Sequence, residues 1–199
     1  MNAHRYFLVH KPINMVSQFV SSHAVHLLGS LDFDFPESTH AIGRLDQASE
    51  GLLLLTTNKK ITKLLFQGSV PHKRTYLVQV KNIVSETTVQ KLAKGLFISA
   101  PSGDQYLTSS CEVQIVMNPQ NISSPQKPLH KNVQFTWLLI SLTEGKYHQV
   151  RKMVAAVGHR CIRLIRVSIE SIELGALKPG EVKEISEAEF FEKLNLNAG

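Results

Sequence analysis

Residues 40–58 read HAIGRLDQASEGLLLLTTN, and the rest of the chain is best interpreted outward from this stretch. Asp46 lies in a polar loop between Gly43 and Gly51, and the apolar run LLLLT of residues 52–56 follows at once. Such a run after a glycine-ended loop predicts a strand buried on both faces. The two glycines indicate backbone turns that a Cβ would hinder. A loop tied to a buried strand can hold a reactive carboxylate rigidly, although an Asp in an ordinary surface turn gives the same spacing.

The pattern G-R-L-D-x-x-S-E-G-L-L-L-L-T-x-N over residues 43–58 resembles the signature loop of the RsuA-like RNA pseudouridine synthases. A second match is Lys11-Pro12, which is similar to the Lys-Pro-x-Gly turn after the family's opening strand. Asn14 stands where many members carry Gly, and Asn tolerates the left-handed backbone conformation. The resemblance covers roughly residues 6–185 and implies the pseudouridine synthase fold.

The charge of the chain is segregated along the sequence. The 199 residues carry a formal net charge of +6, with 43% hydrophobic and 19% charged residues, as in a globular protein. Five Lys or Arg and no acid lie in residues 59–74, and six against the single acid Glu144 lie in residues 143–166. The stretch after Gly180 is acidic instead. This pattern predicts one face that binds a polyanion, with a solvated acidic helix elsewhere.

Cysteine and histidine usage gives no sign of a metal site. Cys111 and Cys161 are far apart and lack a C-x-x-C spacing, so we expect two core thiols in a reducing compartment. His23 and His26 have no Cys or carboxylate nearby to complete a ligand set. The sequence shows no apolar leader and no run of 18 apolar residues, so we expect a cytoplasmic location and no membrane partner.

Alternating patterns predict several strands and few helices, which favours an α+β domain with a large, mainly antiparallel sheet. The resemblance implies that a catalytic cleft bisects this sheet. We expect one catalytic domain over residues 1–199 without an N-terminal S4-like module, and an exposed loop at residues 118–132. Strands are expected at residues 6–9, 52–56, 73–80, 96–98, 111–116, 134–142, 162–167, 168–174 and 182–185. Helices are expected at residues 21–28, 58–66, 85–94 and 147–157, and from Ser186 with a capping box to Glu189.

The resemblance assigns three residues to catalysis: Asp46 as the carboxylate, Tyr76 as the ring that stacks on the target base, and Arg151 as the partner of Asp46. From pattern alone Tyr76 is a core strand residue, and Arg151 could equally contact phosphate. Making pseudouridine involves no net redox change, so no cofactor is required. The carboxylate can attack C1′ of the ribose, add to the base or remove a ribose proton, and the sequence does not choose among these routes.

The remaining site residues are predicted to contact RNA. Arg44 matches the residue that fills the space left by the extruded nucleotide, since the chemistry cannot occur inside a base stack. The phosphate-contact predictions are Lys73, Arg74, Lys152, Arg163 and Arg166. Glu50 lies four residues after Asp46 and is predicted to anchor the loop, although a carboxylate pair would also suit a hydrolase of N-glycosidic bonds.

Three features are most similar to family members that act on large-subunit ribosomal RNA. They are the stretch GKYHQVRKM (residues 145–153), the ending LIRVSIESIELGALKPGE (residues 164–181) and the expected lack of an S4-like module. The expected substrate and partner is therefore 23S rRNA or a large-subunit precursor, and no obligate protein partner is evident. The alternatives are another structured RNA, such as 16S rRNA or tRNA, and a non-catalytic assembly factor that retains the fold.

Overall fold

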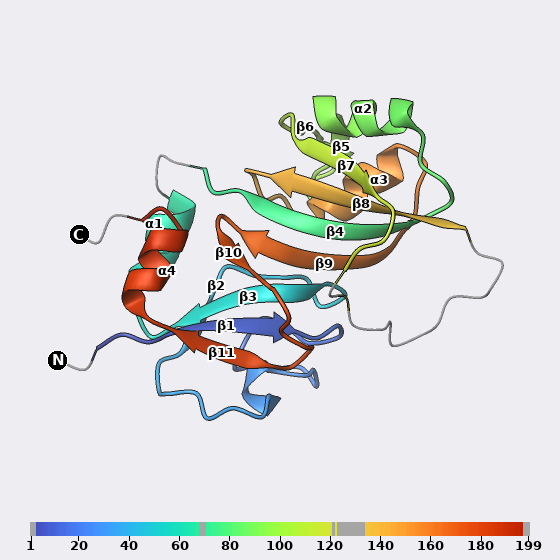
Figure 1. Ribbon diagram of the computed structural model, residues 1–199. Coiled ribbons are helices and arrows are strands. Elements are labelled where there is room, and N and C mark those ends of the chain that lie inside the picture. Colours follow the sequence, from blue (N-terminus) through green and yellow to red (C-terminus); the bar gives the residue numbers. More distant parts are fainter. Residues whose placement is uncertain (1–2, 68–70, 121, 123–133, 197–199) are drawn as a thin grey trace. The chain divides into compact units, whose positions relative to one another are not determined.

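The computed structural model describes residues 3–67, 71–120, 122 and 134–196 (Figure 1). The chain divides into two compact units, one of residues 1–72 and 165–199 and one of residues 73–164. Strand β9 (Cys161–Ile169) begins in the second unit and ends in the first. Most strand pairs are antiparallel, and both units contain helices. The predicted α+β class with a mainly antiparallel sheet is therefore confirmed.

Strand β3 (Glu50–Thr56) is the centre of unit 1, and all seven of its residues are buried. It pairs antiparallel with β1 (Tyr6–Lys11) and with β2 (His40–Ile42), and parallel with β9 at Glu50 and Gly51. On its other edge β1 pairs with β11 (Val182–Ile185), and β10 (Ile172–Glu173) pairs with β9. Leu52, Leu53, Leu54 and Leu55 are all 0% exposed, as expected for a strand covered on both faces.

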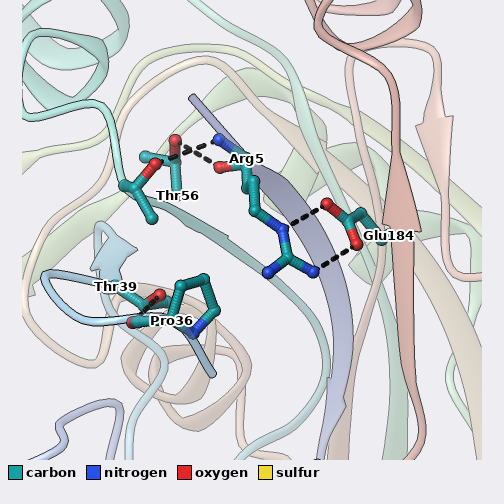
Figure 2. Close-up of polar contacts among 6 residues, drawn as sticks. Arg5, Pro36, Thr39, Thr56 and Glu184 are labelled. Atoms are coloured by element: carbon teal, nitrogen blue, oxygen red, sulfur yellow. Dashed lines mark hydrogen bonds and ion pairs between the residues drawn. The ribbon is translucent and has the colours of Figure 1, made fainter. Parts of the chain in front are cut away.

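Polar contacts join β1 to both of its neighbouring strands. Figure 2 shows the Arg5 guanidinium donating two hydrogen bonds of 2.7 Å to the carboxylate of Glu184 at the β11 edge. On the opposite side the Thr56 hydroxyl donates to the Arg5 carbonyl at 2.9 Å. Because Arg5 and Glu184 are both exposed to solvent, which screens their charges, the ion pair itself adds little to stability. Its fork geometry mainly fixes the register of the strands.

Helix α4 (Glu187–Lys193) packs its aromatic residues onto β1. The ring of Phe190 lies 4.5 Å from that of Tyr6, and the Tyr6 hydroxyl donates to Glu187. Burial and the bond to Glu187 raise the pKa of Tyr6 to about 12. Ser186 caps the helix as predicted, its hydroxyl accepting from the Glu189 amide at 3.2 Å. The Glu189 carboxylate accepts from Lys193 at 2.8 Å.

The remaining elements of unit 1 are short. Helix α1 (Ile61–Gln67) follows β3, and the 3₁₀ helix η1 spans Leu28–Ser30. The helix predicted at residues 21–28 is wrong. The Val16 amide donates to the His26 carbonyl at 3.0 Å and the Leu28 amide to Gln18 at 2.9 Å, so the backbone of this stretch bonds to residues 16–18 instead of coiling on itself.

In unit 2 strand β8 (Phe135–Leu142) lies between β4 (Arg74–Lys81) and β7 (Glu112–Val116), antiparallel to both. A small second sheet joins β5 (Phe97–Ser99) and β6 (Gln105–Leu107). Helix α2 (Glu86–Lys94) begins at the Ser85 cap and ends at Gly95, as predicted. Helix α3 (Gln149–Ala156) buries Val150, Met153 and Val154 in a core shared with β4 and β8.

Two short strands, β2 and β6, were not predicted, because three residues are too few to show an alternating pattern. Most of the loop predicted at residues 118–132 lies outside the described residues. The two cysteines are free and half-buried, and both pack against the core of unit 2.

Candidate active site

Hydrogen bonds fasten the loop that carries Asp46 to the segment that follows β1. The Ser17 hydroxyl donates to the Leu45 carbonyl at 3.0 Å and accepts from the Leu45 amide at 2.9 Å. One residue later the half-buried Asp46 closes a turn, its carbonyl accepting from the Ser49 amide at 2.9 Å. A buried side chain that bonds both backbone groups of Leu45 holds the backbone of the loop directly before Asp46.

Asn14 supplies a second anchor. Its amide donates to the Gln47 carbonyl at 2.8 Å. Asn14 has φ 66°, the left-handed conformation expected from its place in the turn after Lys11-Pro12. Ser17 and Asn14 therefore anchor the loop although they lie about 30 residues before it in the sequence. The sequence pattern around Asp46 gave no sign that Ser17 has this role.

Buried charges surround the start of β3. Lys11 is fully buried, and its ammonium donates to the carbonyls of Pro12 at 2.8 Å and Met15 at 2.7 Å. Burial lowers the pKa of Lys11 to about 8, with Glu50 and Asp46 opposing the shift and Arg166 adding to it. Lys11 therefore feels the charges of Glu50, Asp46 and Arg166. The sequence indicated Lys11 only as the end of a strand.

Gly51 lets β9 approach β3 closely. It has φ +105°, and a Cβ built on it would lie 2.3 Å from the Arg166 carbonyl oxygen. At this point the Nε of Arg166 donates to the Leu52 carbonyl at 2.7 Å. The expectation that a Cβ would hinder the backbone at Gly51 is confirmed.

The two predicted catalytic residues of unit 2 lie on β4 and α3. Tyr76 is half-buried opposite Ile140 of β8 and packs against the core, so its backbone position is rigid. Arg151 is half-buried on α3, and its charge opposes the burial that raises the pKa of Cys161. Asp46 belongs to unit 1, while Tyr76 and Arg151 belong to unit 2. Their meeting at one site stays a prediction.

The loop before α3 is held by one carboxylate. Glu144 accepts hydrogen bonds from the Tyr106 hydroxyl, from the amide and hydroxyl of Ser109, and from Gln149 at 2.6 Å. Burial works against ionisation of Glu144, but these hydrogen bonds prevail and lower its pKa. Gln149 also accepts from the Lys146 amide at 2.8 Å, so the first turn of α3 is tied to the loop.

The basic residues predicted to contact RNA differ in exposure. Arg44 is exposed on the Asp46 loop, and Lys73 is exposed beside Glu112 at 3.4 Å. Arg74 is half-buried against the loop before α3, where a Cβ on Gly145 would lie 2.7 Å from its Nη1. Half-buried Lys152 donates to the Ser99 carbonyl at 2.6 Å.

Arg163 and Arg166 do not fit the predicted role in phosphate binding. They are 7% and 4% exposed, and Arg166 is engaged with the backbone of β3. The clustering of basic residues in the sequence did not show this, because four consecutive residues of β9, 163–166, are buried and not only alternate ones. Their positive charge acts inside the protein instead.

A recess of about 320 Å³ in unit 2 is lined by Lys73, Ser110, Cys111, Glu112, Ser141 and Thr143. None of the residues predicted to be catalytic lines it. Among the described residues no group of three or more His, Cys, Asp or Glu is placed to hold a metal ion. Every helix in the described part of the chain is too short or too polar to cross a bilayer.

Residues 5–156 match the protein family of RNA pseudouridylate synthases. The match covers most of the chain, which therefore belongs to this family and has the pseudouridine synthase fold. It is an RNA pseudouridine synthase, an isomerase.

The chain is similar to individual members of the family and to solved structures. The chain is 34% identical over 180 residues to ribosomal large subunit pseudouridine synthase E of Vibrio vulnificus, covering 90% of this chain and 74% of the relative. It is 29% identical over 186 residues to ribosomal small subunit pseudouridine synthase A of Escherichia coli, covering 93% and 72%. A crystal structure of a pseudouridylate synthase superposes with a TM-score of 0.78 at 26% identity, covering 98% of this chain and 75% of that one.

Proposed function

We propose that the chain isomerises one uridine of large-subunit (23S) ribosomal RNA to pseudouridine, with Asp46 as the catalytic carboxylate. The observation that carries the proposal is the position of Asp46. It sits in a loop anchored by Ser17 and Asn14 directly before a fully buried strand, in a chain of the pseudouridine synthase family.

The reaction breaks the bond between ribose C1′ and uracil N1, turns the base and joins C1′ to C5. The C5 proton is lost and N1 gains one, so no oxidant or cofactor is consumed. Asp46 attacks C1′, adds to the base or removes a ribose proton, and all three routes need an ionised, aimed carboxylate.

In this proposal Tyr76 stacks on the target base and Arg151 pairs with Asp46. Arg44, exposed on the same loop as Asp46, fills the space that the extruded nucleotide leaves in the RNA. Base stacking is tolerant of sequence, so Tyr76 holds the base without selecting it. The surrounding RNA must therefore supply most of the specificity.

The relatives include enzymes named for the large ribosomal subunit and enzymes named for the small one, and their identities to this chain bear on which rRNA is the substrate. The large-subunit enzyme of V. vulnificus is 34% identical and the small-subunit enzyme of E. coli is 29% identical, which favours 23S over 16S rRNA. The second candidate is therefore a uridine of 16S rRNA.

The test is chemical mapping of pseudouridine across 23S and 16S rRNA from cells with and without the gene. We expect one 23S site to be lost, and to be restored by the wild-type gene but not by Asp46→Asn. Asp104→Asn, an exposed Asp beside Ser102, is the matched control and should restore the site. Loss of a 16S site would reassign the substrate, and restoration by Asp46→Asn would remove Asp46 from catalysis. Release of free uracil by purified protein would instead indicate an N-glycosidic hydrolase.

A further inference from the structure

Two aromatic rings stack where the loop after β8 meets α3. The ring centroids of Tyr147 and His148 lie 3.9 Å apart, with 16° between the ring planes. Consecutive side chains of a regular helix point in different directions and do not stack. Here His148 has φ 54°, in the left-handed region, which turns the backbone at the N-cap of α3.

The left-handed backbone at His148 has an energetic cost. Residues other than glycine adopt this conformation at an energetic cost, and such strain gathers at functional sites. Tyr147 is 61% exposed, so most of its surface meets solvent although the ring stacks on His148. Burial of the ring does not explain the arrangement. The strained turn presents a preformed aromatic surface.

Positive charges border this surface. The Lys152 ammonium lies over the Tyr147 ring, 5.2 Å from its centroid, and donates to the Ser99 carbonyl at 2.6 Å. The Lys146 ammonium lies over the Tyr106 ring, 4.3 Å from its centroid. Arg74 lies against Gly145 of the same loop. The one carboxylate in the loop, Glu144, is occupied by Tyr106, Ser109 and Gln149. The outward charge of the loop is therefore positive.

An open ring bordered by cations fits one class of ligand. Single-stranded nucleic acid offers flat bases that stack on aromatic side chains and phosphates that pair with lysine and arginine. We propose that Tyr147, supported from behind by His148, is a stacking subsite for an unpaired base of the RNA outside the target uridine, with Lys146 and Lys152 next to its phosphates. This inference rests on the proposed RNA substrate and concerns residues other than the three assigned to catalysis.

The test uses direct binding of a ten-nucleotide oligouridylate to the full chain, followed by fluorescence anisotropy. Tyr147→Ala should weaken binding about 5- to 150-fold, the range for loss of one aromatic–base stack, whereas Tyr147→Phe should stay within about twofold. Phe97→Ala is the matched control, because Phe97 is an aromatic residue of the same unit with 62% exposure, and it should bind as the wild type does. Equal affinity of Tyr147→Ala and wild type, or an equal loss in Phe97→Ala, overturns the proposal.

A second measurement tests whether a base meets Tyr147. An oligonucleotide of the same length without bases replaces the oligouridylate. Wild-type affinity should fall more than that of Tyr147→Ala, because only the wild type loses the stack on this ring. An equal fall in both proteins would show that no base meets Tyr147, and would overturn the proposal.

Isomerisation of rRNA is assayed separately, so the two proposals fail in different ways. If wild-type protein makes no pseudouridine but the Tyr147 effects on binding persist, the proposed function fails and the subsite stands. If wild-type protein is active and Tyr147→Ala binds and reacts with an unchanged KM, only the subsite is wrong. If both hold, Tyr147→Ala should raise KM and leave kcat near the wild-type value.

Discussion

Gly51 shows how one residue without a side chain sets the start of β3. Its φ of +105° and the 2.3 Å between a built Cβ and the Arg166 carbonyl leave no space for alanine. Gly51→Ala should therefore lower the free energy of unfolding by about 2–5 kcal/mol, measured by urea denaturation. Gly103→Ala is the control, because Gly103 has φ +91° but no atom within 4 Å of a built Cβ. Equal losses in the two variants would contradict the close approach of β9.

Lys11 makes the stability of the protein depend on pH. Its folded pKa of about 8 is below the ordinary 10.5, so between these values the unfolded chain binds more protons. Unfolding free energy should rise with pH across this window, by at most about 1.4 kcal/mol per pH unit relative to Lys11→Met. Thermal unfolding from pH 7 to 10.5 measures the difference. Lys178→Met, at an exposed lysine, should keep the wild-type slope, and parallel curves for wild type and Lys11→Met would exclude a depressed pKa.

A substitution of Arg151 tests whether this residue pairs with the Asp46 carboxylate or contacts an RNA phosphate. Arg151→Lys keeps the charge but loses the planar fork that grips both oxygens of a carboxylate. If Arg151 acts on Asp46, single-turnover rates should fall at least about tenfold while the dissociation constant for RNA changes little. Near-normal rates with weakened binding would assign Arg151 to the RNA backbone. Arg160→Lys, at an exposed position just after α3, should change neither quantity.

At the scale of elements, Glu144 positions the N-terminus of α3. Glu144→Gln replaces an acceptor with a donor facing Gln149 and Tyr106, and should cost about 1–3 kcal/mol of unfolding free energy. Because the folded pKa of Glu144 is lowered, its contribution is complete above the ordinary Glu pKa and is lost as pH falls below that value. Wild type and variant should therefore converge in stability as pH falls through the folded pKa of Glu144, as measured by urea titrations at decreasing pH.

The control for this element is Glu112→Gln. Glu112 is 67% exposed and lies 3.4 Å from Lys73, so its loss should change stability by less than about 0.5 kcal/mol. A similar loss in Glu112→Gln and Glu144→Gln would mean that Glu144 does not fasten the loop.

At the scale of the whole molecule, RNA affinity should fall steeply with salt because charge is segregated along the chain. Basic residues gather at residues 59–74 and 143–166, and acidic residues follow Gly180. Lys152→Gln should flatten the slope of log affinity against log salt by about one unit if Lys152 meets one phosphate. Lys193→Gln, at a lysine paired with Glu189 on the acidic α4, should leave the slope unchanged. An unchanged slope for Lys152→Gln would place this lysine off the RNA face.

The sequence by itself determined the features that depend on near neighbours. The run of four leucines predicted β3, Ser85 and Gly95 marked the ends of α2, and Ser186 marked the start of α4. These signals are local because strand alternation, capping and glycine backbones act within a few residues. The loop of Asp46 was recognised by the same means, through its spacing and its resemblance to the family.

Only the tertiary structure decided which charges are buried and which side chains meet. Lys11, Arg163 and Arg166 look like surface cations in the sequence, but each is less than 9% exposed. Ser17 bonds Leu45 across 28 residues, and Glu144 reaches back to Tyr106 across 38. Tyr147 and His148 stack where the backbone of His148 is left-handed, which the sequence did not indicate. Burial and pairing at such separations arise from packing of distant segments, and a local pattern carries no information about them.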